Sequence, residues 1–151
     1  MSIAQRLADL GVTLPDAPAP AANYVPAVRS GDLLFVSGQI SAGPDGMIKG
    51  RLGDGMSLED GAAAARQCAL NLLAQVRTAC DGDIDRLRRV VKLTGFVNCT
   101  PDFGDQPAVI NGASDFLVEA LGEAGRHSRS AVGATLPFGV AVEIEGIFEI
   151  S

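Results

Sequence analysis

The chain has 151 residues, of which 47% are hydrophobic and 20% charged, and its formal net charge is -6. These values are typical of one globular domain with a substantial core, and they exclude a disordered or fibrous protein. No apolar run reaches the roughly 18 residues that a membrane-spanning helix needs, and the acidic balance disfavours nucleic acid as a partner.

The first 22 residues are predicted to form a short helix and an extended tether, within a single domain that covers 1–151. Ile3, Leu7 and Leu10 have helical spacing, and the proline-rich run from Pro15 to Ala22 favours an extended chain. The N-terminus lacks the basic start and long apolar stretch of a secretory signal. The expected location is therefore the cytoplasm.

Two strands are predicted next, at Tyr24 to Arg29 and at Leu33 to Val36, joined by a turn at Ser30-Gly31-Asp32. Because Leu33 to Val36 is apolar at four consecutive positions, both faces of this strand are predicted to be buried. A further short strand is expected near Met47 to Lys49. The glycine-rich loop that follows lacks the spacing of a phosphate-binding loop.

Two helices are predicted in the second half of the chain. The first runs from a cap at Ser57 to about Cys80, and the second from Asp105 to Gly122. Between them, Arg89 to Asn98 is rich in β-branched residues and is predicted to be a strand. The predicted buried positions are Ala62, Ala65, Ala69, Leu72, Leu73 and Val76 in the first helix, and Val109, Ala113, Phe116, Leu117, Ala120 and Leu121 in the second.

The clearest strand pattern lies between Val140 and Ile150, where one apolar face alternates with a mostly acidic face. The predicted fold class is α+β, with a five- to six-stranded sheet and two helices packed on one face. No segment is left to cover the other face, although Leu33 to Val36 predicts apolar side chains there. An uncovered apolar sheet is usually an interface, so self-association is expected.

The chemistry-bearing residues are few. The chain has one histidine and three cysteines, whose spacing matches no metal or redox motif, so no metal site is expected. The cysteines are predicted to be structural and reduced. They are Cys68, Cys80 and Cys99.

Two side chains remain as candidates for function, each with an alternative. Arg129 begins a predicted strand, where its guanidinium can bind a ligand carboxylate in bidentate fashion or form a structural salt bridge with Glu143 or Glu145. Glu143 lies on a strand among apolar neighbours, where desolvation raises a carboxyl pKa and creates a useful base. Alternatively, Glu143 belongs to a solvated face with Glu145 and Glu149. The residues alone leave both pairs of alternatives open.

Three segments resemble the RidA/YjgF family, which is also called the endoribonuclease L-PSP family. They are Y-V-x-x-V-x-x-G-D-x-x-F-V-S-G-Q-I at Tyr24 to Ile40, V-K-L-T-G-F-V at Val91 to Val97, and R-S-x-V-G-x-x-L-P-x-x-x-x-V-E-I-E-x-I at Arg129 to Ile147. The resemblance implies a chorismate-mutase-like fold and a homotrimer with ligand clefts between subunits. It also implies hydrolysis of reactive 2-imino acids to 2-keto acids and ammonia, without a cofactor.

By position, the resemblance implies that Arg129 grips the substrate carboxylate and that Glu143 helps to place the attacking water. The residues that it implies for the rest of the cleft are Tyr24, Ser37, Gly38 and Asn111. Ala131 replaces the cysteine of the family pattern Arg-Ser-Cys, and its backbone carbonyl could also orient water. The segment from Arg129 to Pro137 is also one residue shorter than that pattern.

These departures leave an alternative function open, that of a non-catalytic trimer that binds a small carboxylate and acts in regulation. An endoribonuclease is less favoured, because the net charge of -6 and the scarcity of aromatic residues oppose RNA binding. The expected partners are therefore a 2-imino or 2-keto acid and further copies of the chain, with neither nucleic acid nor a membrane.

Overall fold

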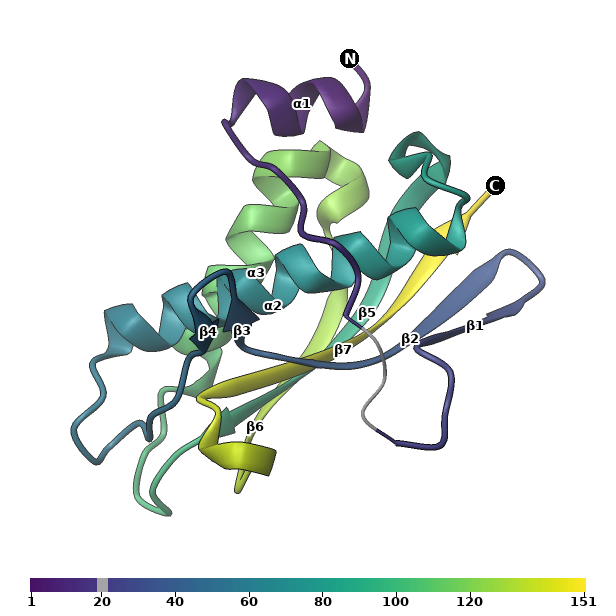
Figure 1. Ribbon diagram of the computed structural model, residues 1–151. Helices are drawn as coiled ribbons and strands as arrows, with labels where there is room; N and C mark the ends of the chain where they lie inside the picture. The colour runs from purple at the N-terminus through teal and green to yellow at the C-terminus, as the bar shows by residue number, and fades with distance from the viewer. Residues whose placement is uncertain (19–21) are drawn as a thin grey trace.

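One mixed sheet forms the centre of the computed structural model, which describes residues 1–18 and 22–151 (Figure 1). Neighbouring strands of this sheet are antiparallel, except for the last pair, which is parallel. The five strands are, in sheet order, β1 (Ala27–Ser30), β2 (Leu33–Ile40), β7 (Val142–Ile150), β5 (Leu87–Asn98) and β6 (Ser128–Ala134). A separate small hairpin pairs β3 (Ala42–Gly43) with β4 (Gly46–Met47).

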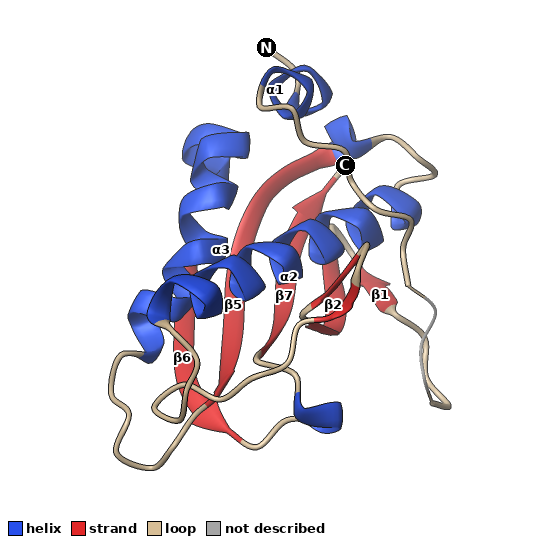
Figure 2. Ribbon diagram, turned by 60° about the vertical axis from the view of Figure 1, so that its left-hand side comes forward, coloured by secondary structure: helices blue, strands red, loops and turns tan. Residues whose placement is uncertain are grey.

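Two long helices, α2 (Leu58–Ala79) and α3 (Gln106–Leu121), cover one face of the sheet, which confirms the predicted α+β class (Figure 2). The Ser57 hydroxyl caps α2 by accepting the Asp60 backbone N–H at 3.1 Å, as predicted. Asp105 precedes α3 but makes no capping hydrogen bond with its side chain. In the described part of the chain, no helix combines the length and hydrophobicity that crossing a membrane would need.

The buried faces of both helices largely follow their predicted stripes. All six predicted positions of α3 are buried, from Val109 to Leu121. Ala62 is the exception in α2 and is only half-buried, because the buried face at that end is centred on Gly61, Ala64 and Ala65.

The N-terminal segment forms the predicted helix, α1 (Ile3–Asp9), and packs onto the body of the chain. The Ile3 backbone N–H donates to the Asp85 carboxylate at 2.6 Å, beside the short 3₁₀ turn η1 (Ile84–Arg86). Leu7 and Leu14 join the same buried cluster as the sheet and the long helices. The predicted tether from Pro15 to Ala22 is described only in part, since 19–21 lie outside the described residues.

The first two strands differ from the prediction, β1 in its bounds and β2 in its burial. β1 begins at Ala27 rather than Tyr24, because Pro26 has no N–H to donate to a sheet ladder. The prediction that both faces of β2 are buried is wrong for the single chain. Leu34 is 2% exposed beneath the helices, whereas Phe35 on the opposite face is 43% exposed, because nothing in the described residues covers that face.

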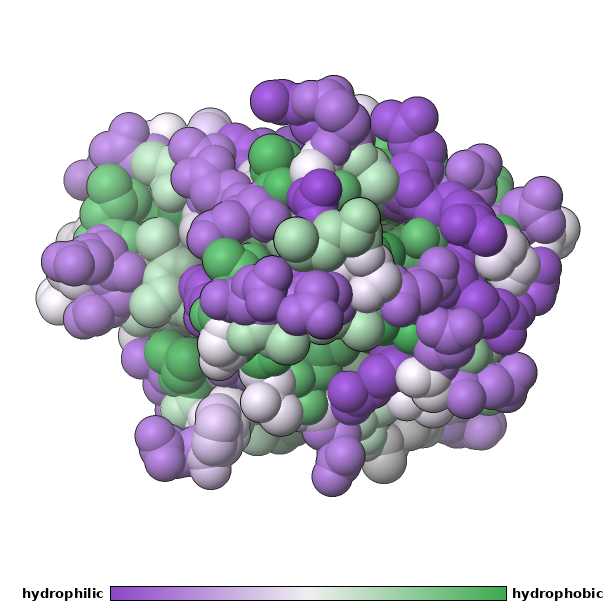
Figure 3. Space-filling view, turned by 90° about the horizontal axis from the view of Figure 1, so that it is seen from above, coloured by the Kyte–Doolittle hydropathy of each residue, from purple (hydrophilic) through white to green (hydrophobic). Residues whose placement is uncertain are grey.

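The uncovered sheet face carries both apolar and acidic side chains. Its strands expose Val28, Phe35 and Val132, and Glu143 and Glu145 project from β7 on the same side because the residues between them are buried. By contrast, the end of the molecule that carries α1 shows mostly hydrophilic side chains around smaller apolar patches (Figure 3). The open sheet face is therefore a candidate surface for self-association.

At Gly112 the backbones of the two long helices are in direct contact. A Cβ at this position would overlap with the backbone carbonyl of Ala62 in α2. We expect Gly112→Ala to lower the free energy of unfolding by about 3 kcal/mol, because a helix backbone cannot move aside as a side chain can. Urea denaturation measures this change. Gly104→Ala is the matched control, because its added Cβ would meet nothing within 4 Å, and equal losses in both variants would contradict the expectation.

Candidate functional site

Arg129 projects from the edge strand β6 toward the helices. It pairs in parallel register with Leu93 of β5, which is fully buried beneath them, so both side chains point to the same face. The guanidinium donates from Nη1 to the Ser114 hydroxyl at 2.9 Å and from Nη2 to the Pro107 carbonyl at 3.1 Å. These contacts anchor Arg129 to α3 and leave three of its five donor hydrogens without a partner in the described part of the chain.

Asn111 and Ala131 share the helix face and the strand face that this guanidinium connects. Asn111 follows Pro107 by four residues and precedes Ser114 by three, so these three residues share one face of α3. Ala131 is two residues after Arg129 and therefore lies on the same face of β6. We call Arg129, Asn111 and Ala131 the arginine cluster.

His127 and Ser114 complete the surroundings of Arg129. The Ser114 hydroxyl lies 2.9 Å from Nε2 of His127, and Nδ1 of the same ring lies 2.6 Å from the Gly125 carbonyl oxygen. The pKa of His127 is lowered, mainly by burial and then by the charge of Arg129, while the Gly125 carbonyl acts in the opposite direction. Neither residue was among the predicted site residues, although the two-residue spacing of His127 and Arg129 places them on one strand face.

Glu143 lies on β7, on the sheet face that the helices leave open. Its neighbours Val142 and Ile144 are fully buried on the other side, which fixes the direction of the carboxylate. Burial raises the pKa of Glu143, and the negative charge of Glu145 raises it further. Part of the desolvation that was predicted for this carboxylate is therefore found in the single chain.

Gly38 lies directly against Glu143, Ser37 precedes it in β2, and Tyr24 is near Ser37 only through Pro26. A Cβ at Gly38 would come within 2.8 Å of Oε2 of Glu143, so the strand passes directly against the carboxylate. Ser37, in the irregular stretch of β2, donates its backbone N–H to the Pro26 carbonyl at 3.0 Å. Tyr24 lies two residues before that proline and is 46% exposed. We call Tyr24, Ser37, Gly38 and Glu143 the glutamate cluster.

The two clusters do not meet within one chain. Only β5 separates Glu143 on β7 from β6, which corresponds to about 10 Å at ordinary strand spacing, and Gly38 on β2 is one strand further away. Arg129 also points to the helix face, whereas Glu143 points to the open face. Among the described residues, no carboxylate lies within 4.0 Å of the Arg129 guanidinium, so the alternative of a salt bridge with Glu143 or Glu145 is not formed.

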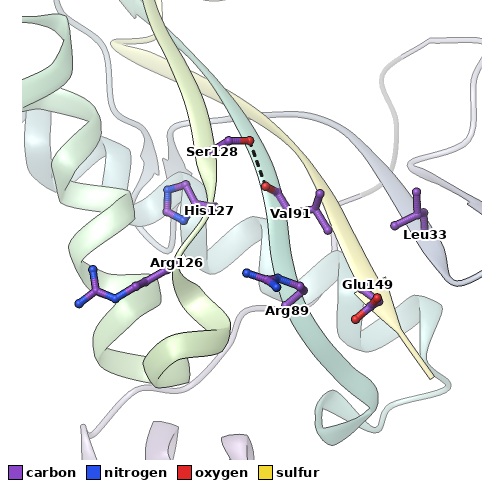
Figure 4. Close-up of a pocket in the computed structure, with 7 residues that line it drawn as sticks. All are labelled: Leu33, Arg89, Val91, Arg126, His127, Ser128 and Glu149. Carbon is purple, nitrogen blue, oxygen red and sulfur yellow. Dashed lines mark hydrogen bonds between the residues drawn. The ribbon is translucent and has the colours of Figure 1, made fainter.

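A shallow pocket of about 590 Å³ lies beside the start of β6 and includes none of the predicted site residues (Figure 4). In the close-up, the His127 ring lies on the α3 side of β6, away from Glu149. The residues that line the pocket are Leu33, Arg89, Val91, Arg126, His127, Ser128 and Glu149.

The cysteines contribute to the core and not to either cluster. Cys68 and Cys80 are fully buried, and burial raises the pKa of both thiols. Across 1–18 and 22–151, no group of three or more histidine, cysteine or acidic side chains is arranged to hold a metal ion.

Comparison with known proteins places these features in context. Residues 4–140 match the family model described as "YjgF/chorismate_mutase-like, putative endoribonuclease". Protein TCP17 of Trypanosoma cruzi is 49% identical over 152 residues, which cover 99% of this chain and 94% of that protein.

Two solved structures extend the comparison. A protein of unknown function from Agrobacterium tumefaciens has a TM-score of 0.91 at 48% identity, over 99% of this chain and 92% of that one. The structure of E. coli TdcF with bound serine has a TM-score of 0.62 at 28% identity, over 89% of this chain and 94% of that one.

Proposed function

The chain belongs to the RidA/YjgF family, and from this premise we propose that it hydrolyses reactive 2-imino acids to 2-keto acids and ammonia, in the cytoplasm and without a cofactor. The observation that carries the proposal is the state of Arg129. Its guanidinium is anchored by two neutral oxygen acceptors and has no carboxylate partner among the described residues. Such a cation suits the bidentate binding of a ligand carboxylate.

The chemistry needs little more than binding and one placed water, because a protonated imine carbon is already electrophilic. Arg129 holds the carboxylate next to that carbon, and Glu143 accepts a proton from the attacking water. As the water oxygen bonds to the imine carbon, the carbon–nitrogen π electrons pass to the nitrogen and give a carbinolamine. Glu143 returns its proton to this nitrogen, the carbon–nitrogen bond breaks, and ammonia leaves while the hydroxyl proton passes to Glu143 and the keto oxygen forms. The raised pKa of Glu143 suits this role, because it brings the base closer to neutral pH. We assign the Ala131 carbonyl the role of helping to orient the water.

A ligand of this chemistry has a parallel in the family. The relative TdcF has been crystallised with bound serine, which is a small molecule with a carboxylate. We therefore assign the same general ligand class to this chain, with Tyr24, Ser37, Gly38 and Asn111 lining the cleft.

The assembled site requires more than one chain. Because the arginine and glutamate clusters lie on opposite faces of one sheet, a ligand could contact both only where two subunits meet. We propose a homotrimer with three such clefts, each of which combines the arginine cluster of one subunit with the glutamate cluster of the next. The exposed apolar side chains Val28 and Phe35 on the open face support this association.

Sedimentation equilibrium at micromolar concentration should give three times the chain mass of 15.5 kDa. Phe35→Glu should shift the protein toward monomers, because it places a charge on the apolar open face. A wild-type protein that sediments as a monomer would rule out the trimer and the inter-subunit cleft together.

The direct test of the activity is release of a 2-keto acid. A dehydratase that uses pyridoxal phosphate supplies 2-iminopropanoate from serine, and pyruvate formation is followed with and without the protein. We expect the wild type to accelerate pyruvate release and Arg129→Ala to leave it at the rate of the buffer. No acceleration by the wild type would reject the enzymatic function.

The replacement of the family cysteine by Ala131 favours one second candidate, a trimer that binds small carboxylates without turning them over. Binding of pyruvate without faster imine hydrolysis would identify this candidate. The family description also mentions an endoribonuclease, and cleavage of RNA that is lost in Arg129→Ala would favour that activity instead.

A further inference from the structure

We propose that Ser114 and His127 are positioning residues that hold the Arg129 guanidinium in one orientation while the imidazole is neutral, and release it when the imidazole is protonated. The consequence for ligand binding rests on the proposed function, in which Arg129 binds the carboxylate. The positioning itself is a property of the chain and can be measured without a ligand.

The hydrogen bonds between these residues have only one consistent direction. The Gly125 carbonyl oxygen can only accept, so Nδ1 of His127, at 2.6 Å, carries the proton. Nε2 of the neutral ring is then an acceptor, and the Ser114 hydroxyl donates to it at 2.9 Å. The hydroxyl oxygen in turn accepts from Nη1 of Arg129. A single chain of donors therefore runs from Arg129 through Ser114 and His127 to Gly125.

Protonation of His127 reverses one link of this chain. Nε2 then carries a proton as well and must donate to the Ser114 oxygen, so that oxygen receives hydrogen bonds from two cations. The serine hydroxyl hydrogen also loses its acceptor. Because an arginine cannot give up its own proton, mutual repulsion weakens the contact between Arg129 and Ser114.

The groups around the ring favour its neutral form. α3 contributes the uncharged Ser114, and β6 contributes Arg129. Three further charged residues line the pocket beside His127, and they are Arg126 from the preceding turn, Arg89 from β5 and Glu149 from β7 (Figure 4). Arg126 is itself paired with Glu123, through its Nε at 3.0 Å.

Burial is the main cause that lowers the pKa of His127 below its ordinary value of 6.5. The charge of Arg129 acts in the same direction, and the Gly125 carbonyl acts against both. The ring is thus neutral at neutral pH, and the release of Arg129 falls in the acidic range.

Side-chain NMR of Arg129 tests the positioning directly. In the wild type, we expect separate, slowly exchanging Nη signals at about pH 7.5 and averaged signals at about pH 5. Ser114→Ala should average the signals at both pH values. His127→Gln should keep them separate at both, because the amide oxygen can accept from Ser114 and does not titrate. Ser130→Ala, an exposed position next to Arg129 on the open face, is the matched control.

The inference is overturned if Ser114→Ala leaves the Arg129 signals unchanged, or if the wild-type signals are the same at both pH values.

A parallel titration uses pyruvate as the probe. Affinity should fall about tenfold in Ser114→Ala and in the acidified wild type, as for the loss of one hydrogen bond to a charged group, but not in acidified His127→Gln. If pyruvate does not bind the wild type at all, the proposed function fails, whereas the NMR result still decides the positioning role. If Arg129→Ala abolishes binding and Ser114→Ala does not weaken it, the inference fails and the proposed function stands.

Discussion

Arg129→Ala is expected to weaken binding of 2-keto acids strongly and to abolish turnover of 2-imino acids while changing the melting temperature only slightly. The guanidinium is half-buried and its two protein contacts are with neutral oxygens, Ser114 Oγ and the Pro107 carbonyl. Removing it leaves no buried carboxylate unpaired, which is the usual cause of a large loss of stability. A bidentate contact with a carboxylate is worth far more, so we expect affinity to fall by about a hundredfold.

The same experiment separates geometry from charge. Arg129→Lys should recover little of the affinity, because an ammonium group cannot form two parallel hydrogen bonds to one carboxylate. Melting curves and pyruvate titrations of both variants give the two readouts. Arg126→Ala is the matched control, since this arginine is exposed and already paired with Glu123. A variant Arg129→Ala that binds pyruvate normally, or one that fails to fold, would remove the basis of the site assignment.

The sequence predicted the elements of the fold best where a hydrophobic pattern repeated over many residues. Every predicted apolar position of α3 is buried, because sixteen residues of helix repeat the 3.6-residue period several times. The alternation in β7 likewise placed Glu143 on the face opposite Val142 and Ile144. Short elements were less certain, as the late start of β1 after Pro26 illustrates.

The arrangement of the candidate site depended on information that local patterns do not contain. The face toward which Arg129 points is set by its register with Leu93 in a parallel strand pair. These two residues are far apart in the sequence, because the whole of α3 lies between them. No local period encodes that register. The Ser114 contact follows from the packing of α3 on β6 and could not be predicted without it. The resemblance named residues of both clusters, but only the sheet order shows that one chain keeps them apart.

Glu143→Gln is expected to lower kcat for imine hydrolysis by about a hundredfold, which is a usual contribution of a general base. The free energy of unfolding, by contrast, should rise in this variant at neutral pH. Because burial raises the pKa of Glu143 above its ordinary value of 4.5, the folded chain holds this proton more tightly than the unfolded chain does. The ionised carboxylate therefore costs stability, and this cost develops as the pH rises from 4.5 through the raised pKa.

Glutamine has the shape of the carboxyl group without its charge, so Glu143→Gln should melt at a higher temperature than the wild type at neutral pH. The two proteins should converge below pH 4.5, where the wild-type carboxyl is protonated in both states. Wild-type turnover should rise with pH through the raised pKa, and the variant should lack this limb. Glu149→Gln, on the same face of β7, should match the wild type in turnover. Full activity in Glu143→Gln would show that the attacking water is activated by another group.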